Sequence, residues 1–170
     1  MNKGMSGDPS KILAVQGVGW VKRKALSMGT VTTIMRHFKD EQGVERIRVD
    51  STLASHPVST EERILDWTER SREDPLAGPV VARMRRVAPS ELEFDFLKTG
   101  WTADTLEHGL IHLNVEPGPG NKNRWSVNQT YGIQEINGER RYVAHSKITT
   151  PSGEGHEILL VYDYLGPLEA

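Results

Sequence analysis

From Thr30 to the end of the chain, polar and apolar residues tend to alternate, and β-branched residues are frequent. A period of two is typical of strands with one buried face, whereas helices show a period near 3.6. Eight segments carry this pattern and are separated by turn-forming residues: 30–38, 46–53, 63–70, 80–87, 110–115, 125–136, 140–149 and 156–165. Since most of these segments follow one another without a helical pattern between them, the chain is predicted to be mainly β.

The turns between these segments are short enough to join antiparallel neighbours. Asn137 and Gly138 follow segment 125–136, and this pair favours the positive backbone dihedrals of a type I′ hairpin turn. Residues 40–43 and 152–153 also have the composition of turns. An antiparallel meander is therefore predicted, which either leaves two exposed edges or closes into a barrel.

Helical spacing of apolar residues occurs near the front of the chain, at about residues 9–28. Gly17 and Gly19 interrupt this spacing, and each glycine costs about 1 kcal/mol inside a helix. We therefore predict two short helices joined at Gly17. Two other stretches break the strand pattern: residues 88–104, whose structure the pattern leaves open, and residues 117–121, which read as a loop tip.

The composition excludes several classes of protein. The chain has 170 residues, a length suited to a single domain spanning residues 1–170, and it has no run of about 18 apolar residues that could be stably inserted in a membrane. The absence of cysteine excludes disulfides, thiolate metal ligands and a cysteine nucleophile, and it favours a cytoplasmic location. The net charge of -2 creates no field that would attract nucleic acid. The oligomeric state is left open.

A resemblance to a known family rests on residues 15–34, VQGVGWVKRKALSMGTVTTI. This stretch resembles the helix-turn-helix and following strand of intracellular fatty-acid-binding proteins, in which a GVGF link precedes a basic pair. Residues 17–20 match the link, Arg23 and Lys24 match the basic pair, and the ending LLVYDY is similar to the terminal strand of that family. The resemblance covers about a fifth of the chain. It implies a lipocalin-like (calycin) antiparallel up-and-down barrel of about nine or ten strands, with a helix-turn-helix lid at about residues 9–28.

The same resemblance implies a ligand other than a simple fatty acid. Many members of that family hold a ligand carboxylate with two arginines and a tyrosine on late strands. Here the two arginine positions align with Ile133 and Leu160, and only Tyr162 matches. Because an aliphatic side chain cannot replace a bidentate guanidinium, we expect a small hydrophobic ligand whose polar group is weaker than a carboxylate.

Strand alternation predicts which side chains face the interior of such a barrel. Counting from the Asn137–Gly138 turn and from the terminal strand gives an inward face of aromatic, aliphatic and amide side chains, the mixture expected for a small-molecule pocket. The family alignment adds three residues of the helical lid, and a packed core without a cavity is the alternative. The predicted ligand-binding residues are Leu13, Val18, Leu26, Trp125, Gln129, Tyr131, Ile133, Tyr142, Leu160 and Tyr162.

Two functions use the same predicted cavity. The first is binding of a small hydrophobic molecule, and the alternative is a cofactor-independent isomerase or cyclase of a biosynthetic pathway. The sequence also resembles fungal proteins of unassigned activity, and some lipocalin-type barrels in that setting serve such pathways. Tyr131, Tyr142 and Tyr162 are the candidate catalytic residues, because a buried tyrosine can donate a hydrogen bond to a carbonyl or act as an acid. Catalysis by shape and hydrogen bonding alone requires no cofactor, and none is expected.

The remaining polar clusters have simpler interpretations. His108 and His112 have the spacing of zinc ligands on a helix, but on a strand they would lie about 13 Å apart, so no metal site is predicted. His145 falls on the outer face of its strand and is predicted to be solvated. The arginines at 83, 85, 86, 140 and 141 could suggest an anionic partner, but a solvated face is favoured because acidic residues offset them.

Overall fold

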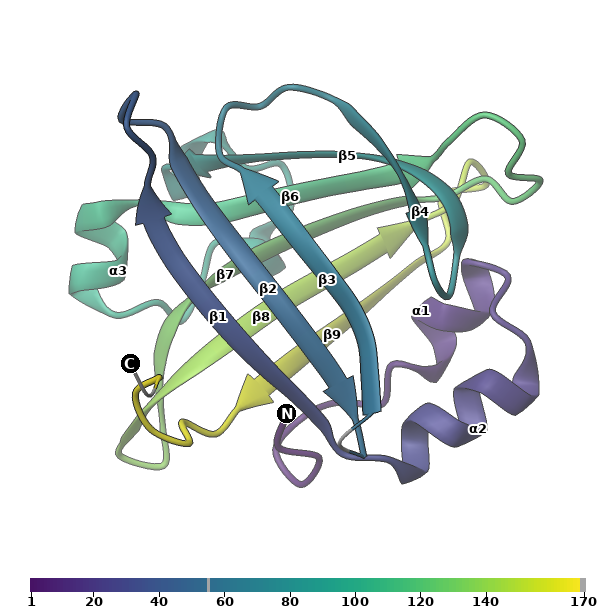
Figure 1. The fold of residues 1–170 in the computed structure, drawn as a ribbon, viewed down its shortest axis with the longest axis horizontal. Helices are drawn as coiled ribbons and strands as arrows, with labels where there is room; N and C mark the ends of the chain where they lie inside the picture. Colours follow the sequence, from purple (N-terminus) through teal and green to yellow (C-terminus); the bar gives the residue numbers. More distant parts are fainter. Residues whose placement is uncertain (55, 169–170) are drawn as a thin grey trace.

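The computed structural model describes residues 1–54 and 56–168. Nine strands, three short α-helices and two 3₁₀ turns lie in these residues (Figure 1). In chain order they are α1 (Ser10–Val15), α2 (Trp20–Met28), β1 (Val31–Lys39), β2 (Glu45–Leu53), β3 (His56–Ile64), β4 (Arg70–Asp74), β5 (Gly78–Val87), η1 (Pro89–Glu91), η2 (Asp95–Leu97), α3 (Ala103–His108), β6 (Leu110–Pro117), β7 (Ser126–Ile136), β8 (Glu139–Thr149) and β9 (Gly155–Tyr162).

The strands form two antiparallel sheets. Strands β1, β2 and β3 make a three-stranded sheet, and β4 to β9 make a six-stranded sheet, each in chain order. Figure 1 shows the smaller sheet crossing one face of the larger. The prediction of a mainly β, antiparallel fold is confirmed. Because no ladder joins β3 to β4 or β9 to β1 in the described residues, closure into a barrel stays a prediction.

The first residues of the chain run along the edge of β9. The backbone nitrogen of Asn2 donates to Val161 O at 2.8 Å, and that of Gly7 donates to Leu159 O at 2.9 Å. The nitrogen of Met1 reaches the first residue of β1, Val31 O, at 2.7 Å. This segment therefore links the outer strands of the two sheets.

The hairpin predicted at Asn137 and Gly138 is confirmed. Both residues have positive φ, 54° and 78° respectively, as a type I′ turn requires. The turn sets the register of β7 and β8, which pairs Gln129 with Ser146 and Tyr131 with Ala144. Since paired residues share a face of the sheet, the inward face of this hairpin follows the prediction.

The predicted strand at 63–70 is wrong. The structure has two strands here, β3 and β4, and the turn between them occupies most of the predicted segment. Trp67 lies in that turn with a φ of 61°, and its backbone nitrogen donates to Met84 O at 2.8 Å. β3 and β4 are edge strands rich in charged residues, so neither shows the alternation that marks a half-buried strand.

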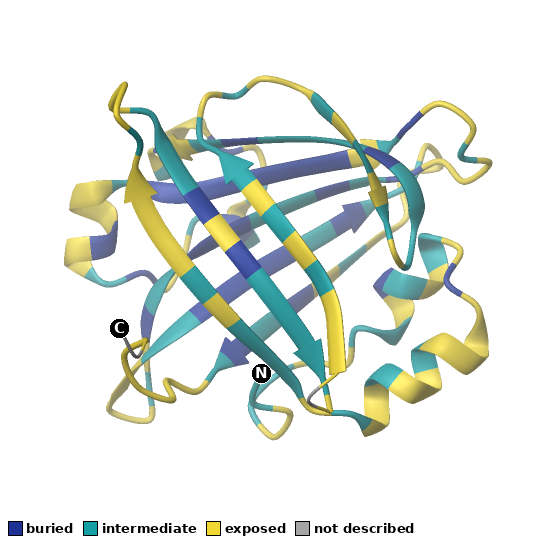
Figure 2. Cartoon of the chain, viewed as in Figure 1, coloured by how far each residue is buried: buried dark blue, intermediate teal, exposed yellow. Residues whose placement is uncertain are grey.

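The main core lies between the two sheets. Figure 2 shows buried residues along β2 of the smaller sheet and along β5 to β9 of the larger one, whereas α2 and most of β1 are exposed. The two short helices lie within the predicted range of about residues 9–28. In α1 the side chain of Ile12 is buried, whereas no residue of α2 is buried. None of the helices in the described residues has the length and hydrophobicity needed to cross a membrane.

A second apolar cluster lies on the opposite face of the larger sheet, under residues 89–108. Leu97 and Trp101 pack there against Val143 and Val161. Gly132 makes this approach feasible, because a Cβ at that position would lie 3.0 Å from the Trp101 ring and 2.5 Å from the Thr105 methyl group. The segment that the sequence pattern left open is thus an outer layer of the fold.

This layer also buries His145, so the prediction of a solvated histidine is wrong. His145 is on the outer face of β8, as expected, but it is only 5% exposed. Its ring lies between Phe96 and Trp101, with ring centroids 4.7 and 4.6 Å away. Its Nδ1 contacts Phe96 O at 2.5 Å, and its Nε2 contacts the Gln134 amide nitrogen at 2.8 Å. Both ring nitrogens are therefore occupied within the protein.

Burial lowers the pKa of His145, and the hydrogen bond to Phe96 only partly opposes this effect. The unfolded chain therefore binds a proton more readily, so the free energy of unfolding should be fully present above about pH 6.5 and fall as the pH drops below it. His112, whose pKa burial also lowers, contributes to the same window. The free energy of unfolding, measured with urea between about pH 7.5 and 5.5, should depend less on pH in His145→Gln than in the native chain. The control is His56→Gln, at an exposed position. If the free energy of unfolding depends on pH as strongly in His145→Gln as in the native chain, the prediction is wrong.

Candidate functional site

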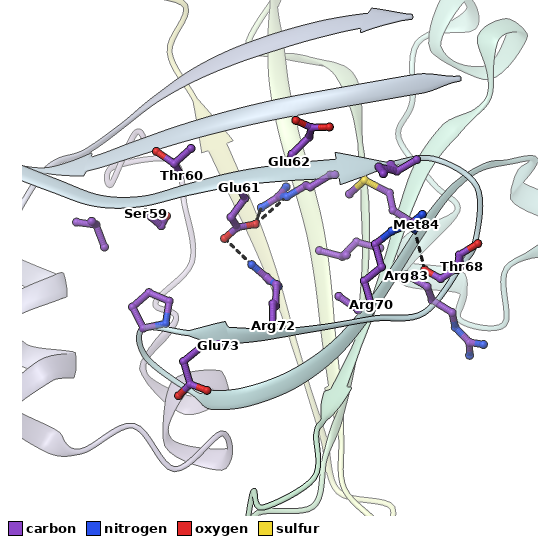
Figure 3. Close-up of a pocket in the computed structure, with 16 residues that line it drawn as sticks. Ser59, Thr60, Glu61, Glu62, Thr68, Arg70, Arg72, Glu73, Arg83 and Met84 are labelled. Atoms are coloured by element: carbon purple, nitrogen blue, oxygen red, sulfur yellow. Dashed lines mark hydrogen bonds and ion pairs between the residues drawn. The ribbon is translucent and has the colours of Figure 1, made fainter. Parts of the chain in front are cut away.

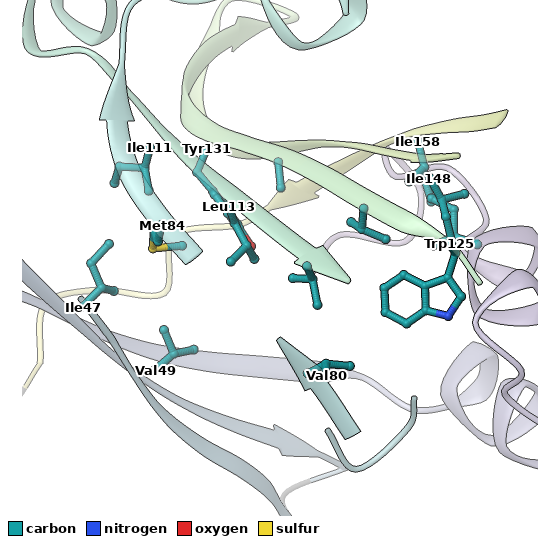
Figure 4. Packing of buried hydrophobic residues seen from close by; sticks show 14 residues of the cluster. Ile47, Val49, Val80, Met84, Ile111, Leu113, Trp125, Tyr131, Ile148 and Ile158 are labelled. Carbon is teal, nitrogen blue, oxygen red and sulfur yellow. The ribbon is translucent and has the colours of Figure 1, made fainter. Parts of the chain in front are cut away.

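An inner chamber of about 210 Å³ lies between the two sheets. Its walls combine apolar side chains of the main core with polar and charged ones, and Figure 4 shows the apolar side chains converging from both sheets. Trp125 lies at the end near the helices, where Ile12 of α1 and the following Gln16 also contribute to the wall. The polar and charged residues of the lining are Gln16, Glu61, Arg63, Arg72, Asp74, Gln129, Tyr131 and Ser146.

A chain of hydrogen bonds enters this chamber from β3. The Arg63 guanidinium donates from Nη1 to the Tyr131 hydroxyl at 3.4 Å, and that hydroxyl donates to Gln129 Oε1 at 2.7 Å. The carbonyl of the Gln129 amide is thereby engaged. Within residues 1–54 and 56–168, its NH₂ group has no protein acceptor, and the same holds for the hydroxyl of Ser146, its cross-strand neighbour. Two hydrogen-bond donors therefore remain free in the wall of the chamber.

Glu61 binds two arginines at the wall of the chamber. Its carboxylate lies 2.9 Å from Arg63 Nη2 and 2.7 Å from Arg72 Nη1, and these three side chains are 18–28% exposed. Burial disfavours each charge, yet the pKa of Arg63 is raised because Tyr131 and Glu61 lie against it. Burial likewise opposes ionisation of Glu61, but the two arginines lower its pKa more strongly. Both shifts favour the charged forms of Glu61 and Arg63, and the two ion pairs hold the three side chains in place.

The three candidate tyrosines form a row. Their ring centroids are 6.1 Å apart for Tyr131 and Tyr142 and 5.7 Å apart for Tyr142 and Tyr162. Burial raises the pKa of Tyr162 to about 12 and raises the pKa values of the other two as well. An efficient general acid has a pKa near the working pH, so these hydroxyls are better suited to donating hydrogen bonds than to transferring protons.

The structure brings together part of the predicted site. Trp125, Gln129 and Tyr131 line the chamber, and Tyr142, Leu160 and Tyr162 pack against the same apolar cluster. Ile133 continues that face of β7, opposite Tyr142. Leu13, Val18 and Leu26 are absent from the lining of both described cavities, and Ile12 and Gln16 represent the helices instead. Contact of any of these residues with a ligand stays a prediction.

Sequence reasoning missed Glu61, Arg63 and Arg72. All three lie on the two strands that the pattern did not resolve, and charged residues are usually interpreted as a solvated face. The spacing of Glu61 and Arg63 by two residues, which puts both on one face of a strand, was the available signal. The chamber does contain a guanidinium, that of Arg63, although positions 133 and 160, which align with the carboxylate-binding arginines of fatty-acid-binding proteins, hold isoleucine and leucine. Since it is already paired with Glu61, it still supports a ligand with a polar group weaker than a carboxylate.

A larger groove of about 500 Å³ opens beside the chamber, between β3 and β4 (Figure 3). Ala82, Met84 and Leu113 contribute apolar surface to it, and charged side chains of β3 and β4 stand around it. Figure 3 shows Glu61 bonded to Arg72 across the gap between the two strands. The groove and the chamber share Glu61, Arg63, Arg72 and Leu113, so they adjoin along one wall.

The surface arginines are paired locally. Arg83 and Arg85 stack on Trp67, each with its guanidinium carbon 4.6 Å from the ring centroid. Both also approach acidic side chains, as does Arg86, which lies 2.5 Å from Glu45. This pairing favours the prediction of a solvated face. Among the described residues, no group of three or more histidine or acidic side chains could hold a metal ion.

Two curated proteins are similar to this chain over nearly its whole length. The probable pericyclase scpY of Mollisia scopiformis is 31% identical in an alignment of 175 positions that covers 100% of this chain and 89% of the relative. The pericyclase pydY of Acremonium sp is 29% identical over 174 positions, which cover 98% of this chain and 89% of the relative. The chain belongs to this pericyclase family.

The similarity to the pericyclases includes all the residues of the candidate site. Because the alignment with scpY spans the full chain, every strand that lines the chamber lies within the compared region. No family model matches the chain, and no solved structure matches it. The resemblance to fatty-acid-binding proteins is therefore not tested by these comparisons and stays a prediction.

Proposed function

We propose that this chain is a pericyclase that rearranges a small hydrophobic molecule in the inner chamber without a cofactor. The two relatives named as pericyclases support this proposal. It corresponds to the alternative that the sequence raised, a cofactor-independent isomerase or cyclase of a biosynthetic pathway. Simple binding of a hydrophobic ligand is the competing function, since it would use the same chamber.

A pericyclic reaction makes modest demands on an enzyme. Bonds form and break together in a cyclic array of electrons, so no atom is gained or lost and no group is transferred to the protein. The enzyme can accelerate the reaction by holding the substrate in its reactive conformation and by stabilising charge that develops in the transition state. The apolar side chains of the chamber support the first contribution, and a few oriented hydrogen-bond donors support the second.

The observation that carries the proposal is the free amide of Gln129. Its carbonyl accepts a hydrogen bond from Tyr131, whose hydroxyl in turn accepts one from the positively charged Arg63. Hydrogen bonds in such a chain polarise one another, and a charged group at one end strengthens the effect. The Gln129 NH₂ group is therefore a strengthened donor, and together with Ser146 it can bind a substrate carbonyl conjugated to the reacting double bonds.

The first helix covers one end of the chamber. Ile12 of α1 and Gln16, which follows it, line the chamber beside Trp125, whereas α2 buries no residue. We propose that, of the two-helix lid predicted at about residues 9–28, α1 limits the access of water to the donors. Exclusion of water strengthens a hydrogen bond to the substrate because it lowers the local dielectric constant.

Deletion of the gene in its host should test the proposed reaction. The deletion strain should accumulate a compound with the same mass as the missing product but a different retention time, because a pericyclic rearrangement conserves every atom. Purified protein should then convert the accumulated compound faster than buffer or heat-denatured protein does. A precursor of different mass would exclude an isomerisation, and binding without conversion would indicate a carrier.

A further inference from the structure

We propose that the groove between β3 and β4 is the second compartment of the substrate site and holds a non-reacting apolar arm of the substrate. This inference rests on the proposed function. The substrate class is then an elongated hydrophobic molecule, with a carbonyl at the end that enters the inner chamber and a hydrocarbon arm at the other end. Four observations lead to this assignment.

The first observation is the size of the two cavities. Sites for small molecules usually measure about 300–1,000 Å³. The inner chamber, at about 210 Å³, lies below that range, whereas the groove has about 500 Å³. The chamber can hold the reacting part of a molecule, but a longer molecule needs space outside it.

The second observation is continuity. Leu113 lines both cavities, and so do Arg63 and the Glu61–Arg72 pair. Leu113 is 6% exposed and Met84, which also lines the groove, is 3% exposed, so the apolar surface of the groove belongs to the core. A molecule bound in the chamber therefore meets the groove at this common wall.

The third observation is the absence of a backbone ladder at this wall. β3 pairs only with β2, and β4 pairs only with β5, within the described residues. The Glu61–Arg72 ion pair crosses from one sheet to the other at 2.7 Å. Two side chains can separate without breaking a ladder of backbone hydrogen bonds, so an arm that passes between the sheets here leaves the backbone pairing of both sheets intact.

The fourth observation defines the chemistry of the arm. Most charged groups around the groove are paired: Arg70 binds Asp66 through two contacts of 2.7 Å, and Glu62 lies 2.6 Å from Arg46. A charged arm that binds one of these groups would have to displace its partner. A hydrocarbon arm instead covers Ala82 and the neighbouring apolar side chains, which favours association through burial of apolar surface.

Two neutral fluorescent ketones provide a matched pair of probes. Prodan and laurdan carry the same dimethylaminonaphthalene ketone and differ only in the acyl arm, which is propionyl in prodan and dodecanoyl in laurdan. The native protein should bind laurdan at least about tenfold more tightly than prodan, the gain expected from burying two methylene groups. Ala82→Phe, which fills the groove, should reduce laurdan affinity to that of prodan and leave prodan affinity unchanged.

The controls separate the groove from general hydrophobicity. Ala25→Phe makes the same substitution on the exposed face of α2 and should preserve the advantage of laurdan. Thr68→Trp fills the groove from its exposed rim and should likewise remove the advantage of laurdan. It provides the test if Ala82→Phe does not fold. Arg72→Gln should accelerate laurdan binding in stopped-flow fluorescence, whereas Arg86→Gln, which breaks the other ion pair between the two sheets, should not.

The outcomes separate this inference from the proposed function. If laurdan keeps its advantage in folded Ala82→Phe and Thr68→Trp, the arm lies elsewhere and the inference is wrong, while the inner chamber is unaffected. If Gln129→Leu does not weaken prodan binding, the proposed contact in the chamber is wrong. If laurdan loses its advantage in affinity in both groove variants and Gln129→Leu weakens prodan binding, the results support both the groove as the site of the arm and the contact in the chamber.

Discussion

Replacement of Gln129 by leucine should lower kcat for the rearrangement by about 10²- to 10³-fold, the usual effect of removing one preorganised hydrogen-bond donor from a transition state. Leucine is close to glutamine in volume, so the chamber should keep its shape. It removes the amide that Tyr131 and Arg63 polarise. The affinity for the substrate should fall less than the rate, because the carbonyl gains negative charge only as the reaction proceeds.

The tyrosines offer matched controls for this prediction. Tyr131→Phe should slow the reaction by up to about tenfold, because it removes one neutral hydrogen bond from the chain that ends at Gln129. Tyr142→Phe and Tyr162→Phe should leave kcat within about twofold of the native value, since in the described residues the tyrosine bonded to the Gln129 amide is Tyr131. Single-turnover measurements on the purified precursor distinguish these variants. A native rate in Gln129→Leu would exclude this amide as the donor.

Replacement of Trp101 by alanine should lower the free energy of unfolding by about 3–5 kcal/mol, as expected when a large aromatic side chain is removed from a core. Trp101 is 8% exposed, and its indole nitrogen donates to Leu97 O at 3.1 Å. It packs on His145 and covers Gly132. The substitution removes these contacts together and should loosen residues 89–108 from the larger sheet.

Urea unfolding measures this effect, and Trp20→Ala is the matched control. Trp20 is 68% exposed at the start of α2, so its removal should change the free energy of unfolding by less than about 0.5 kcal/mol. Hydrogen exchange should show faster exchange in residues 89–108 of Trp101→Ala than in the native chain. A loss below about 1 kcal/mol would mean that the outer layer contributes little to stability.

Much of the fold was predictable because its signals are local. A two-residue Asn137–Gly138 turn fixes which residues of β7 and β8 face each other, and alternation then places every second side chain on one face. This reasoning correctly placed Trp125, Gln129 and Tyr131 on one side of the larger sheet, where they line the chamber. It also located the two short helices, since glycine is unfavourable in the interior of a helix whatever the surrounding fold.

The prediction failed where the environment of a residue depends on distant segments. β3 and β4 are edge strands with many polar and charged residues, so their sequences do not show the alternation of a half-buried strand, and the predicted strand at 63–70 fell mostly on the turn between them. His145 lies on the outer face of a strand, which usually means solvent, but residues 89–108 return to cover it. Neither outcome can be obtained from alternation along a single strand.

The sequence by itself determined the strand-rich architecture, the β7–β8 register and the apolar inward face, because these depend on steric and hydrophobic preferences of neighbouring residues. Only the tertiary structure decided what chemistry the inward face can perform. Tyr131 engages the side-chain carbonyl of Gln129 and leaves its NH₂ group available as a donor. Arg63 reaches that tyrosine from a different sheet, 68 positions away in the chain. Electrostatic and hydrogen-bond partners act through space, so the sequence specifies these side chains without showing that they meet.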